Sequence, residues 1–285
     1  MILLQVIVGG LLIGAVYALF SSGLTLIWGM MNVINFAHGE FVMLGMYAAF
    51  WAYTLAGIGP AGFVPIAALL LFILGVLVYM GLIRHVMRGP MLAQILSTFG
   101  LLLLLRYSAF WVFSANFVTL PDGLVGPSID IGGIFVTASK LLAGGVAILL
   151  TAGMHLLLTR TAIGSQILAV AEDRQAAMLM GIKPDRMQAL AWGLAGASAG
   201  IAGALIATFF PISPTVGESL AIIAFVTVTL GGFGSVPGAM LAGLLIGLIE
   251  SLSAFYLGPV YQDVVVYALF VVILWVRPHG LLGKA

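Results

Sequence analysis

Two ionisable residues lie deep in apolar stretches of the sequence, Arg106 and Glu250. A charged side chain at the centre of a bilayer costs roughly 2.5–3.5 kcal/mol, so it usually finds an opposite charge or a water-filled path. Their opposite charges predict that Arg106 and Glu250 form an ion pair with one another inside a helical bundle. The alternative interpretation places both along a translocation path or at its gate.

Asn35, His38 and Glu40 form the densest polar cluster before Arg84. Asparagine is a preferred helix cap, and the positive end of the helix dipole favours a carboxylate in the first turn. The cluster therefore predicts a helix start, with Asn35 as cap and Glu40 in the first turn. A second interpretation places the three side chains near the permeation path. Glu218 is expected at an outer helix end, where it is solvated or touches a binding protein.

Charge gathers in one other place, residues 160–186, which hold seven of the nineteen Lys, Arg, Asp and Glu residues. We call these residues the charged segment. Ile163, Ile167 and Val170 recur at helical spacing, so one side of a helix could rest on the bundle. Gly181 and Pro184 are stop signals, and we predict a short helix from 164 to 180. The pattern is typical both of a solvated loop and of a docking element for a partner.

Catalytic chemistry has no support in the sequence. No Ser, His and Asp set, no carboxylate pair and no metal-ligand spacing emerges. The absence of cysteine excludes disulfides and thiolate metal sites. A Walker A loop needs Gly-Lys before Ser or Thr, and the only Gly-Lys, Gly283-Lys284, precedes Ala285. We therefore predict a chain that is not an enzyme and holds no cofactor or metal.

The composition identifies the environment of these residues. Hydrophobic residues make up 63% of the 285 and charged residues 7%, whereas soluble domains carry about 25% charged residues. Apolar runs of about 20 residues recur, each long enough to cross a hydrocarbon core about 30 Å thick. The prediction is an all-α polytopic transmembrane bundle, one domain over residues 1–285. We place spans at 2–27, 40–57, 62–83, 91–113, 138–158, 187–210, 218–232, 238–256 and 261–276.

The predicted number of spans is eight to ten. Residues 218–232 are short for a full crossing, and residues 19–36 could form an irregular extra one. Glycines four residues apart occur in three pairs, which predict close helix packing within the chain: Gly10 and Gly14, Gly196 and Gly200, Gly243 and Gly247. Gly-rich breaks occur once in each half, at 32–39 and 231–238, as in transporters built from repeats.

Basic residues predict the orientation. Eight of the ten lie in three clusters, at 84–88, 160–186 and 277–284, separated by even numbers of predicted spans. All three clusters can therefore share one side, and the positive-inside rule makes that side cytoplasmic. The charged segment and the C-terminus are expected there. The N-terminal residues lack the basic start of a signal peptide and are interpreted as a retained first span, whose side the count leaves open.

Three stretches carry a resemblance to a known family. Within the charged segment, Ala171-Glu172-Asp173, Ala177, Gly181-Ile182 and Pro184 resemble the degenerate EAA-type motif of ABC-importer permeases. Residues 34–41, INFAHGEF, and residues 230–239, LGGFGSVPGA, resemble signatures of branched-chain amino-acid permeases of the LivH type. The three stretches lie in the expected order, and the similarity runs over nearly the whole chain.

The resemblance implies a permease subunit of an ABC importer in a bacterial inner membrane, which moves branched-chain amino acids by alternating access. The partners it implies are two ATP-binding subunits, where ATP would be bound, a second related permease chain, an extracytoplasmic substrate-binding protein and membrane lipid, but no nucleic acid. It assigns coupling to the ATPase to Ala171, Glu172, Asp173, Ala177 and Gly181. The alternatives are a permease for urea or short amides, and an ion-coupled carrier that uses His38, Glu40, Arg106 and Glu250.

Overall fold

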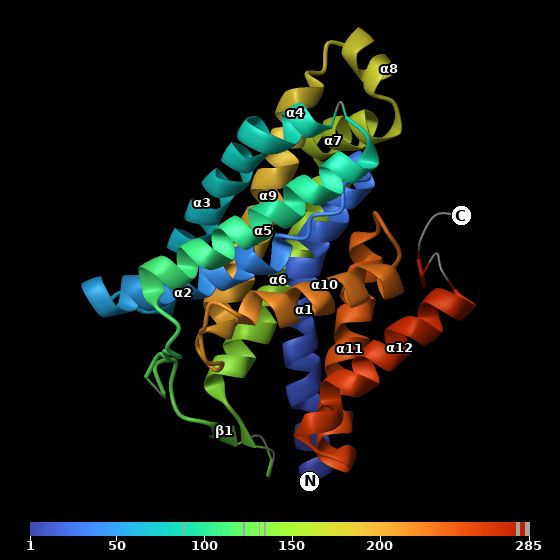
Figure 1. The fold of residues 1–285 in the computed structure, drawn as a ribbon. Helices are drawn as coiled ribbons and strands as arrows, with labels where there is room; N and C mark the ends of the chain where they lie inside the picture. Colours follow the sequence, from blue (N-terminus) through green and yellow to red (C-terminus); the bar gives the residue numbers. More distant parts are fainter. Residues whose placement is uncertain (88, 122, 131, 134, 278–279, 283–285) are drawn as a thin grey trace.

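A computed structural model describes residues 1–285 except 88, 122, 131, 134, 278–279 and 283–285. Figure 1 shows a bundle of helices with one small hairpin. The helices are α1 (Ile2–Met31), α2 (His38–Ala56), α3 (Pro60–Val78), a π-helical turn (Tyr79–Ile83), α4 (Arg84–Val86), α5 (Met91–Phe113), α6 (Ala138–Arg160), α7 (Ala162–Glu172), α8 (Arg174–Leu179), α9 (Pro184–Ile206), α10 (Val216–Gly231), α11 (Val236–Leu257), a 3₁₀ turn (Pro259–Tyr261) and α12 (Gln262–Val276).

The hairpin lies in the connection between α5 and α6. Strand β1 (Ile129–Asp130) pairs antiparallel with β2 (Phe135–Val136). An isolated bridge joins Val118 of the same connection to Ile212, which follows α9. In Figure 1 this connection lies at the same end of the bundle as the N-terminus, and α8 lies at the opposite end. We call these ends the N-terminal end and the α8 end.

The all-α polytopic prediction is confirmed, but the span count is too high. Seven helices in the described part of the chain are long and apolar enough to cross a membrane. Two of the nine predicted spans correspond to α2 and α10, which are not among the seven. The polar start of α2, with His38 and Glu40, lowers its hydropathy, and α10 has only 16 residues.

The extra irregular span expected at 19–36 is wrong. Residues 19–31 continue α1, a helix of 30 residues that measures about 45 Å at 1.5 Å per residue. Ser22 is accommodated inside this helix because its hydroxyl donates to the Leu19 carbonyl at 2.6 Å. The helix ends at Asn32, which adopts a left-handed conformation at φ 52° and donates its N–H to the Trp28 carbonyl.

The prediction that paired glycines pack helices within the chain is confirmed for α1 and α11. A Cβ added at Gly14 would lie 2.5 Å from the Gly243 carbonyl oxygen, and one at Gly10 would lie 2.8 Å from the Gly247 carbonyl oxygen. The two backbones therefore touch. Such contact matters in lipid, where helices associate through van der Waals packing and hydrogen bonds and gain little from apolar burial.

The third glycine pair packs α9 against α3. A Cβ on Gly200 would meet Ala67 and Leu71, and one on Gly196 would meet the Leu71 carbonyl. Close to the α8 end, the Tyr79 hydroxyl donates to Gln188 of α9 at 2.7 Å. Helices α1 and α9 are thus the two central helices; α5 packs outside them on α2, and α12 packs on α11 and α10.

Both predicted Gly-rich breaks are present. Residues 32–37 separate α1 from α2, and residues 232–235 separate α10 from α11. The second break packs against the end of α1, where the rings of Trp28 and Phe233 lie 4.6 Å apart. The C-terminal residues add a cap to α10: the N–H groups of Leu281 and Leu282 donate to the carbonyls of Leu230 and Gly231.

The packing of α1 on α11 gives a testable prediction. Replacing Gly14 with Ala inserts a methyl group against backbone atoms that cannot rotate away. We expect Gly14→Ala to lower the free energy of unfolding by about 1–3 kcal/mol, measured as a lower midpoint of thermal unfolding in detergent. Gly145→Ala in α6 is the control, because a Cβ there has nothing within 4 Å. Equal midpoints for the two variants would contradict the packing described.

Candidate functional site

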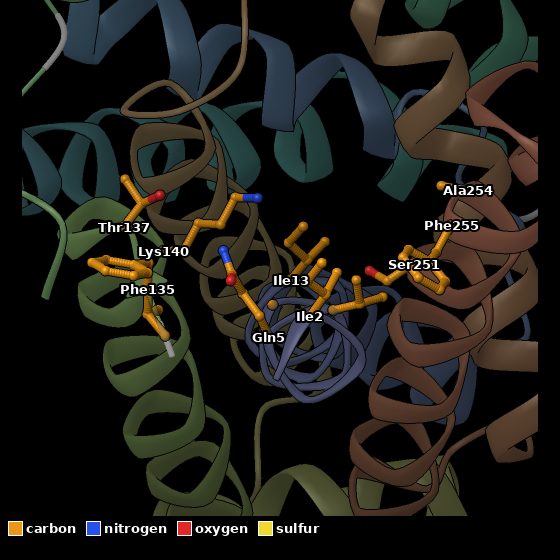
Figure 2. Close-up of a pocket in the computed structure, with 12 residues that line it drawn as sticks. Ile2, Gln5, Ile13, Phe135, Thr137, Lys140, Ser251, Ala254 and Phe255 are labelled. Carbon is orange, nitrogen blue, oxygen red and sulfur yellow. The ribbon is translucent and has the colours of Figure 1, made fainter. Parts of the chain in front are cut away.

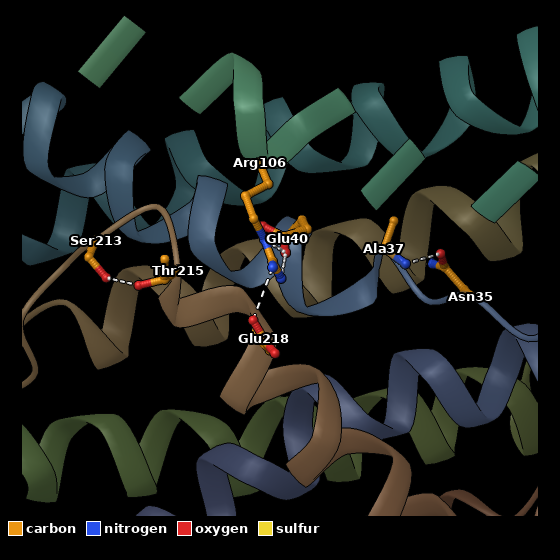
Figure 3. Close-up of polar contacts among 7 residues, drawn as sticks. All are labelled: Asn35, Ala37, Glu40, Arg106, Ser213, Thr215 and Glu218. Carbon is orange, nitrogen blue, oxygen red and sulfur yellow. Dashed lines mark hydrogen bonds and ion pairs between the residues drawn. The ribbon is translucent and has the colours of Figure 1, made fainter. Parts of the chain in front are cut away.

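A charge junction joins three helices in the interior of the bundle. Arg106 of α5 donates from Nε and Nη2 to Oε1 of Glu40, at 3.0 and 2.7 Å. Its Nη1 donates to Oε2 of Glu218 at 3.0 Å. Figure 3 shows the guanidinium reaching down from α5 between the starts of α2 and α10. We call Glu40, Arg106 and Glu218 the charge junction.

The start of α2 is held at this place by its own polar residues. The Asn35 side chain accepts a hydrogen bond from the Ala37 N–H at 3.1 Å, one residue before the helix (Figure 3). The His38 ring bonds to the carbonyl of Phe20, in the middle of α1, at 2.7 Å. Asn35 therefore turns the chain into α2 without being the helix cap itself, which is Ala37. Glu40 lies in the first turn, as predicted.

The starts of α2 and α10 come together because two glycines face one another. A Cβ on Gly39 would collide with the Gly217 carbonyl oxygen, and a Cβ on Gly217 would lie 2.7 Å from Oε2 of Glu40. Both helix starts carry a partial positive charge of about +0.5 from the helix dipole. Two carboxylates and one guanidinium sum to −1, so the two helix ends bring the junction close to neutral.

The two ion pairs differ in environment. The Glu40 side chain is 1% exposed and that of Arg106 15%, whereas that of Glu218 is 63% exposed. The second carboxylate oxygen of Glu40 is buried without a hydrogen-bond partner. Removing one partner of a buried pair typically costs about 3–5 kcal/mol, while exposed pairs contribute about 0.2–1 kcal/mol. The Glu40–Arg106 pair is thus structural, and Glu218 is the exchangeable partner.

The predicted pairing of Arg106 with Glu250 is wrong. Glu250 lies on α11, which packs against α1, and its nearest titratable neighbour on that helix is Tyr17. Arg106 lies on α5, which packs against α2. The expectation for Glu218 is also corrected, since it is exposed but paired with Arg106. The sequence did hold a clue to the location of Glu218, since this residue begins a segment, 218–232, that is too short to cross a membrane.

The charged segment forms two helices, and the single helix predicted over 164–180 is wrong. The chain breaks at Asp173, which is extended at φ −148° and ψ 106°. Its Oδ1 accepts the N–H groups of Gln175 and Ala176 at 2.8 and 3.0 Å and so caps α8. A competing N-cap therefore overrides a continuous helical pattern. Gly181 ends the unit at φ +80°.

The five predicted coupling residues have different surroundings. Ala177 is buried, and its cluster includes residues from α1, α9 and the rest of the charged segment. Ala171 is half-buried, while Glu172, Asp173 and Gly181 are exposed. Sequence reasoning missed an apolar patch beside them, with exposed fractions of 50, 89 and 82% for Met178, Leu179 and Met180. Three successive large apolar residues in a charged segment were the signal that could have revealed it.

Ion pairs join α8 to the start of α9, and the start of α9 to α4. Asp185, in the first turn of α9, accepts from Arg174 of α8 at 2.9 Å and from Arg84 of α4 at 3.0 Å. Figure 1 places α4, α7, α8 and the start of α9 together at one end. The basic residues Arg84 and Arg174 therefore share an end of the molecule, as the orientation argument expects. Arg88 and Lys284 lie outside the described residues.

A cavity of about 580 Å³ separates α7 from the break between α10 and α11. Ala171 and Glu172 line one wall, and Phe233 and Ser235 line the opposite wall. Trp28 of α1 forms part of the wall between them. A second cavity, of about 450 Å³, opens at the N-terminal end, where Figure 2 shows Gln5, Lys140 and Ser251 around it.

The pairing at the charge junction can be tested by a double-mutant cycle. Because Glu40 and Arg106 are in contact, we expect the unfolding free energies of Glu40→Gln and Arg106→Gln to be non-additive by about 0.5–3 kcal/mol. Glu250→Gln with Arg106→Gln is the matched control, and these two should add within about 0.3–0.5 kcal/mol. Denaturation of the purified protein in detergent measures both cycles. Coupling to Glu250 and not to Glu40 would restore the pairing first expected.

Comparisons with known proteins agree over nearly the whole chain. Residues 6–274 match the family described as branched-chain amino acid transport system, permease component. The chain is 33% identical to the high-affinity branched-chain amino acid transport system permease protein BraD of Pseudomonas aeruginosa, over 99% of this chain and 96% of BraD. LivH of Escherichia coli K12, a permease protein with the same description, is also 33% identical, with the same coverage.

A solved structure, PsaBC from Streptococcus pneumoniae in complex with Fab, shares the fold. Its TM-score is 0.55 at 10% identity, and the match covers 95% of this chain and 91% of that one. A similarity at this identity supports the helical architecture alone. The family match and the full-length relatives carry the assignment: the chain belongs to the branched-chain amino acid transport system permease family, whose members span membranes.

Proposed function

We propose that this chain is the permease subunit of an ABC importer, which moves leucine, isoleucine and valine across the inner membrane by alternating access. The observation that carries the proposal is the end-to-end similarity to permeases named for high-affinity branched-chain amino acid transport. The charge junction and the charged segment fit that role, because one offers a polar site in an apolar bundle and the other offers a surface for a motor.

The motor is a pair of separate ATP-binding subunits that dock on the charged segment. Exposed large apolar side chains in an otherwise polar stretch are a usual mark of a protein contact, and Leu179 and Met180 are almost fully exposed. Glu172 and Asp173 border this patch. In this assignment Glu172 and the apolar patch touch the ATPase, while Asp173 and Ala177 shape the helix that presents them.

Orientation follows from the same assignment. The α8 end, with Arg84, Arg160 and Arg174, is cytoplasmic, as the positive-inside rule requires. Arg277, a basic residue at the end of α12, supports a cytoplasmic C-terminus as well. The N-terminus lies at the opposite end of α1 and is then outside (Figure 1). An extracytoplasmic binding protein delivers substrate at this N-terminal end.

The translocation path passes the charge junction. Lipid cannot solvate the exposed carboxylate of Glu218, so that side chain faces water or a second permease chain. A related permease chain opposite α5 and α10 would enclose a path between the two subunits. Asn35, His38 and Glu40 set the start of α2 beside this path, and Arg106 borders it. Glu250, packed between α11 and α1, is removed from the path in this proposal.

Motion at the charged segment has a route to the path. The cavity beside α7 leaves space for α7 to move towards the break at 232–235, where α10 ends. Helix α10 is short and begins at Val216, two residues before Glu218 of the charge junction. A displacement of α7 can therefore shift α10 and change the contact between Glu218 and Arg106. Alternating access requires such an element with two arrangements.

Transport is tested with the chain reconstituted together with its ATP-binding subunits, second permease and binding protein. We expect ATP-dependent uptake of radiolabelled leucine and valine, no uptake of urea, and no effect of an uncoupler. Uptake of urea in place of leucine would identify the chain as a urea permease. Leucine uptake that continues without ATP and collapses with an uncoupler would identify an ion-coupled carrier instead.

Docking on the apolar patch is tested by Leu179→Glu. The new charge removes apolar contact without disturbing the fold, since this side chain is 89% exposed. We expect at least a fivefold loss of co-purified ATP-binding subunit and of leucine uptake, a change of about 1 kcal/mol in association. Leu257→Glu, also exposed but at the opposite end from α8, is the control and should keep the co-purified ATP-binding subunit. Unchanged co-purification in Leu179→Glu would exclude this docking surface.

A further inference from the structure

Arg106 is shared unequally between its two carboxylate partners. Glu40 receives two of its N–H groups and lies almost wholly buried, whereas Glu218 receives one and is largely exposed. Glu218 can therefore leave Arg106 without uncovering a buried charge. When it leaves, Nη1 of Arg106 is available to another carboxylate, and Glu218 is available to a cation.

A free amino acid carries both of the required charges. We propose, on the basis of the importer function above, that Arg106 and Glu218 bind the zwitterionic backbone of the transported amino acid. The substrate carboxylate takes the place of Glu218 on Nη1 of Arg106, and the substrate ammonium group pairs with Glu218. Glu40 stays on the other edge of the guanidinium and holds it in position.

The exchange leaves the net charge of the junction unchanged, because a zwitterion adds one charge of each sign. An anion without an ammonium group would leave Glu218 unpaired, and a cation without a carboxylate would leave Nη1 of Arg106 unpaired. Unpaired charges in a partly dehydrated site are costly. The site therefore selects for both groups together, which urea and simple amides lack.

Apolar side chains on the same helix faces as Arg106 and Glu218 could contact the substrate side chain. Residues three or four apart share a helix face, so Leu103 is on the face of Arg106 in α5 and Ile222 is on the face of Glu218 in α10. Both are 37% exposed. The start of α10 also presents its positive dipole end and the hydroxyl of Thr215, which lies three residues before Glu218 (Figure 3).

Binding of substrate at this place would cut the direct link between α5 and α10. Arg106–Glu218 is the ion pair that joins these two helices in the described part of the chain. Once the substrate is bound, its ammonium and carboxylate groups bridge α10 and α5. The two helices can then lie farther apart than when Arg106 and Glu218 are in direct contact. Occupancy of the site is thereby communicated to the helix that ends at the cavity beside α7.

Recognition is tested by ligand-induced thermal stabilisation of the assembled membrane complex, without its binding protein. Three probes share one side chain: L-leucine, L-leucinamide, which lacks the carboxylate, and 4-methylpentanoate, which lacks the ammonium group. A ligand that binds only the native state raises the melting temperature in proportion to its occupancy. We expect millimolar leucine to raise the melting temperature of the wild type and the two analogues to leave it unchanged.

The decisive variant is Glu218→Gln, whose exposed position preserves folding. We expect it to abolish the shift caused by leucine and to reduce ATP-driven leucine uptake at least tenfold, with an unchanged melting temperature in the absence of ligand. Ser219→Ala, the exposed neighbour on α10, is the control and should keep both. Arg106→Lys should reduce the rise in melting temperature caused by leucine. The single ammonium group of Lys cannot bind Glu40 and the substrate carboxylate through separate N–H groups in the way that a guanidinium does.

The proposal is overturned if leucine causes no shift in the wild type, if either analogue shifts it equally, or if Glu218→Gln keeps the wild-type response and uptake. These results leave ATP-driven leucine uptake by the wild type intact, so the importer function would stand without this site. A wild-type complex that fails to accumulate leucine would instead overturn the importer function itself.

Discussion

The arrangement of this protein depends on one largely buried guanidinium group, that of Arg106. Arg106 sits on an apolar helix, and its charge is balanced by carboxylates from two other helices. Neither α2 nor α10 could begin in the interior of an apolar bundle without that balance, because both starts expose unpaired N–H groups and a carboxylate. The glycines at 39 and 217 then permit the two starts to approach within contact distance. The charge junction and the starts of α2 and α10 therefore depend on one another.

A second level of organisation connects this junction to the charged segment. Helix α8 is capped by Asp173, and exposed ion pairs through Asp185 join it to α9 and join α9 to α4. Helix α7 packs against α1, α6 and α9, and a cavity lies between it and the break after α10. In the proposed mechanism, α7 and α10 connect the exposed apolar patch at the α8 end to the ion pair between Arg106 and Glu218.

Composition and hydropathy were sufficient to predict the class and the charged segment. The seven long apolar helices are among the nine predicted spans, but the count also included α2 and α10. Glycine spacing also predicted close helix packing within the chain, and the structure shows that the glycines at 10 and 14 lie against those at 243 and 247. The partner of Arg106 could not be found in this way. Pairing depends on which helices are neighbours in space, and α5 packs on α2 and not on α11. Depth in an apolar run selected Glu250, whereas the true partners stand at helix starts.

The break within the charged segment escaped prediction for a related reason. A helical period continues through Asp173, and only the hydrogen bonds of its carboxylate to the next turn show that a new helix begins. Capping and continuation are close in free energy, a matter of about 1 kcal/mol. Tertiary contacts of Ala177 and Asp185 decide between them, and a sequence pattern contains neither.

The cap on the end of α10 bears on how the protein is made. The carbonyls of Leu230 and Gly231 are bound by Leu281 and Leu282, which follow α11 and α12 in the chain. Synthesis proceeds from the N-terminus, so α10 enters the membrane before the residues that close it exist. The carbonyls of its final turn therefore lack these two hydrogen bonds until α11 and α12 have been inserted. Helix α10, which carries Glu218 of the charge junction, therefore gains its full set of hydrogen bonds late in synthesis and insertion.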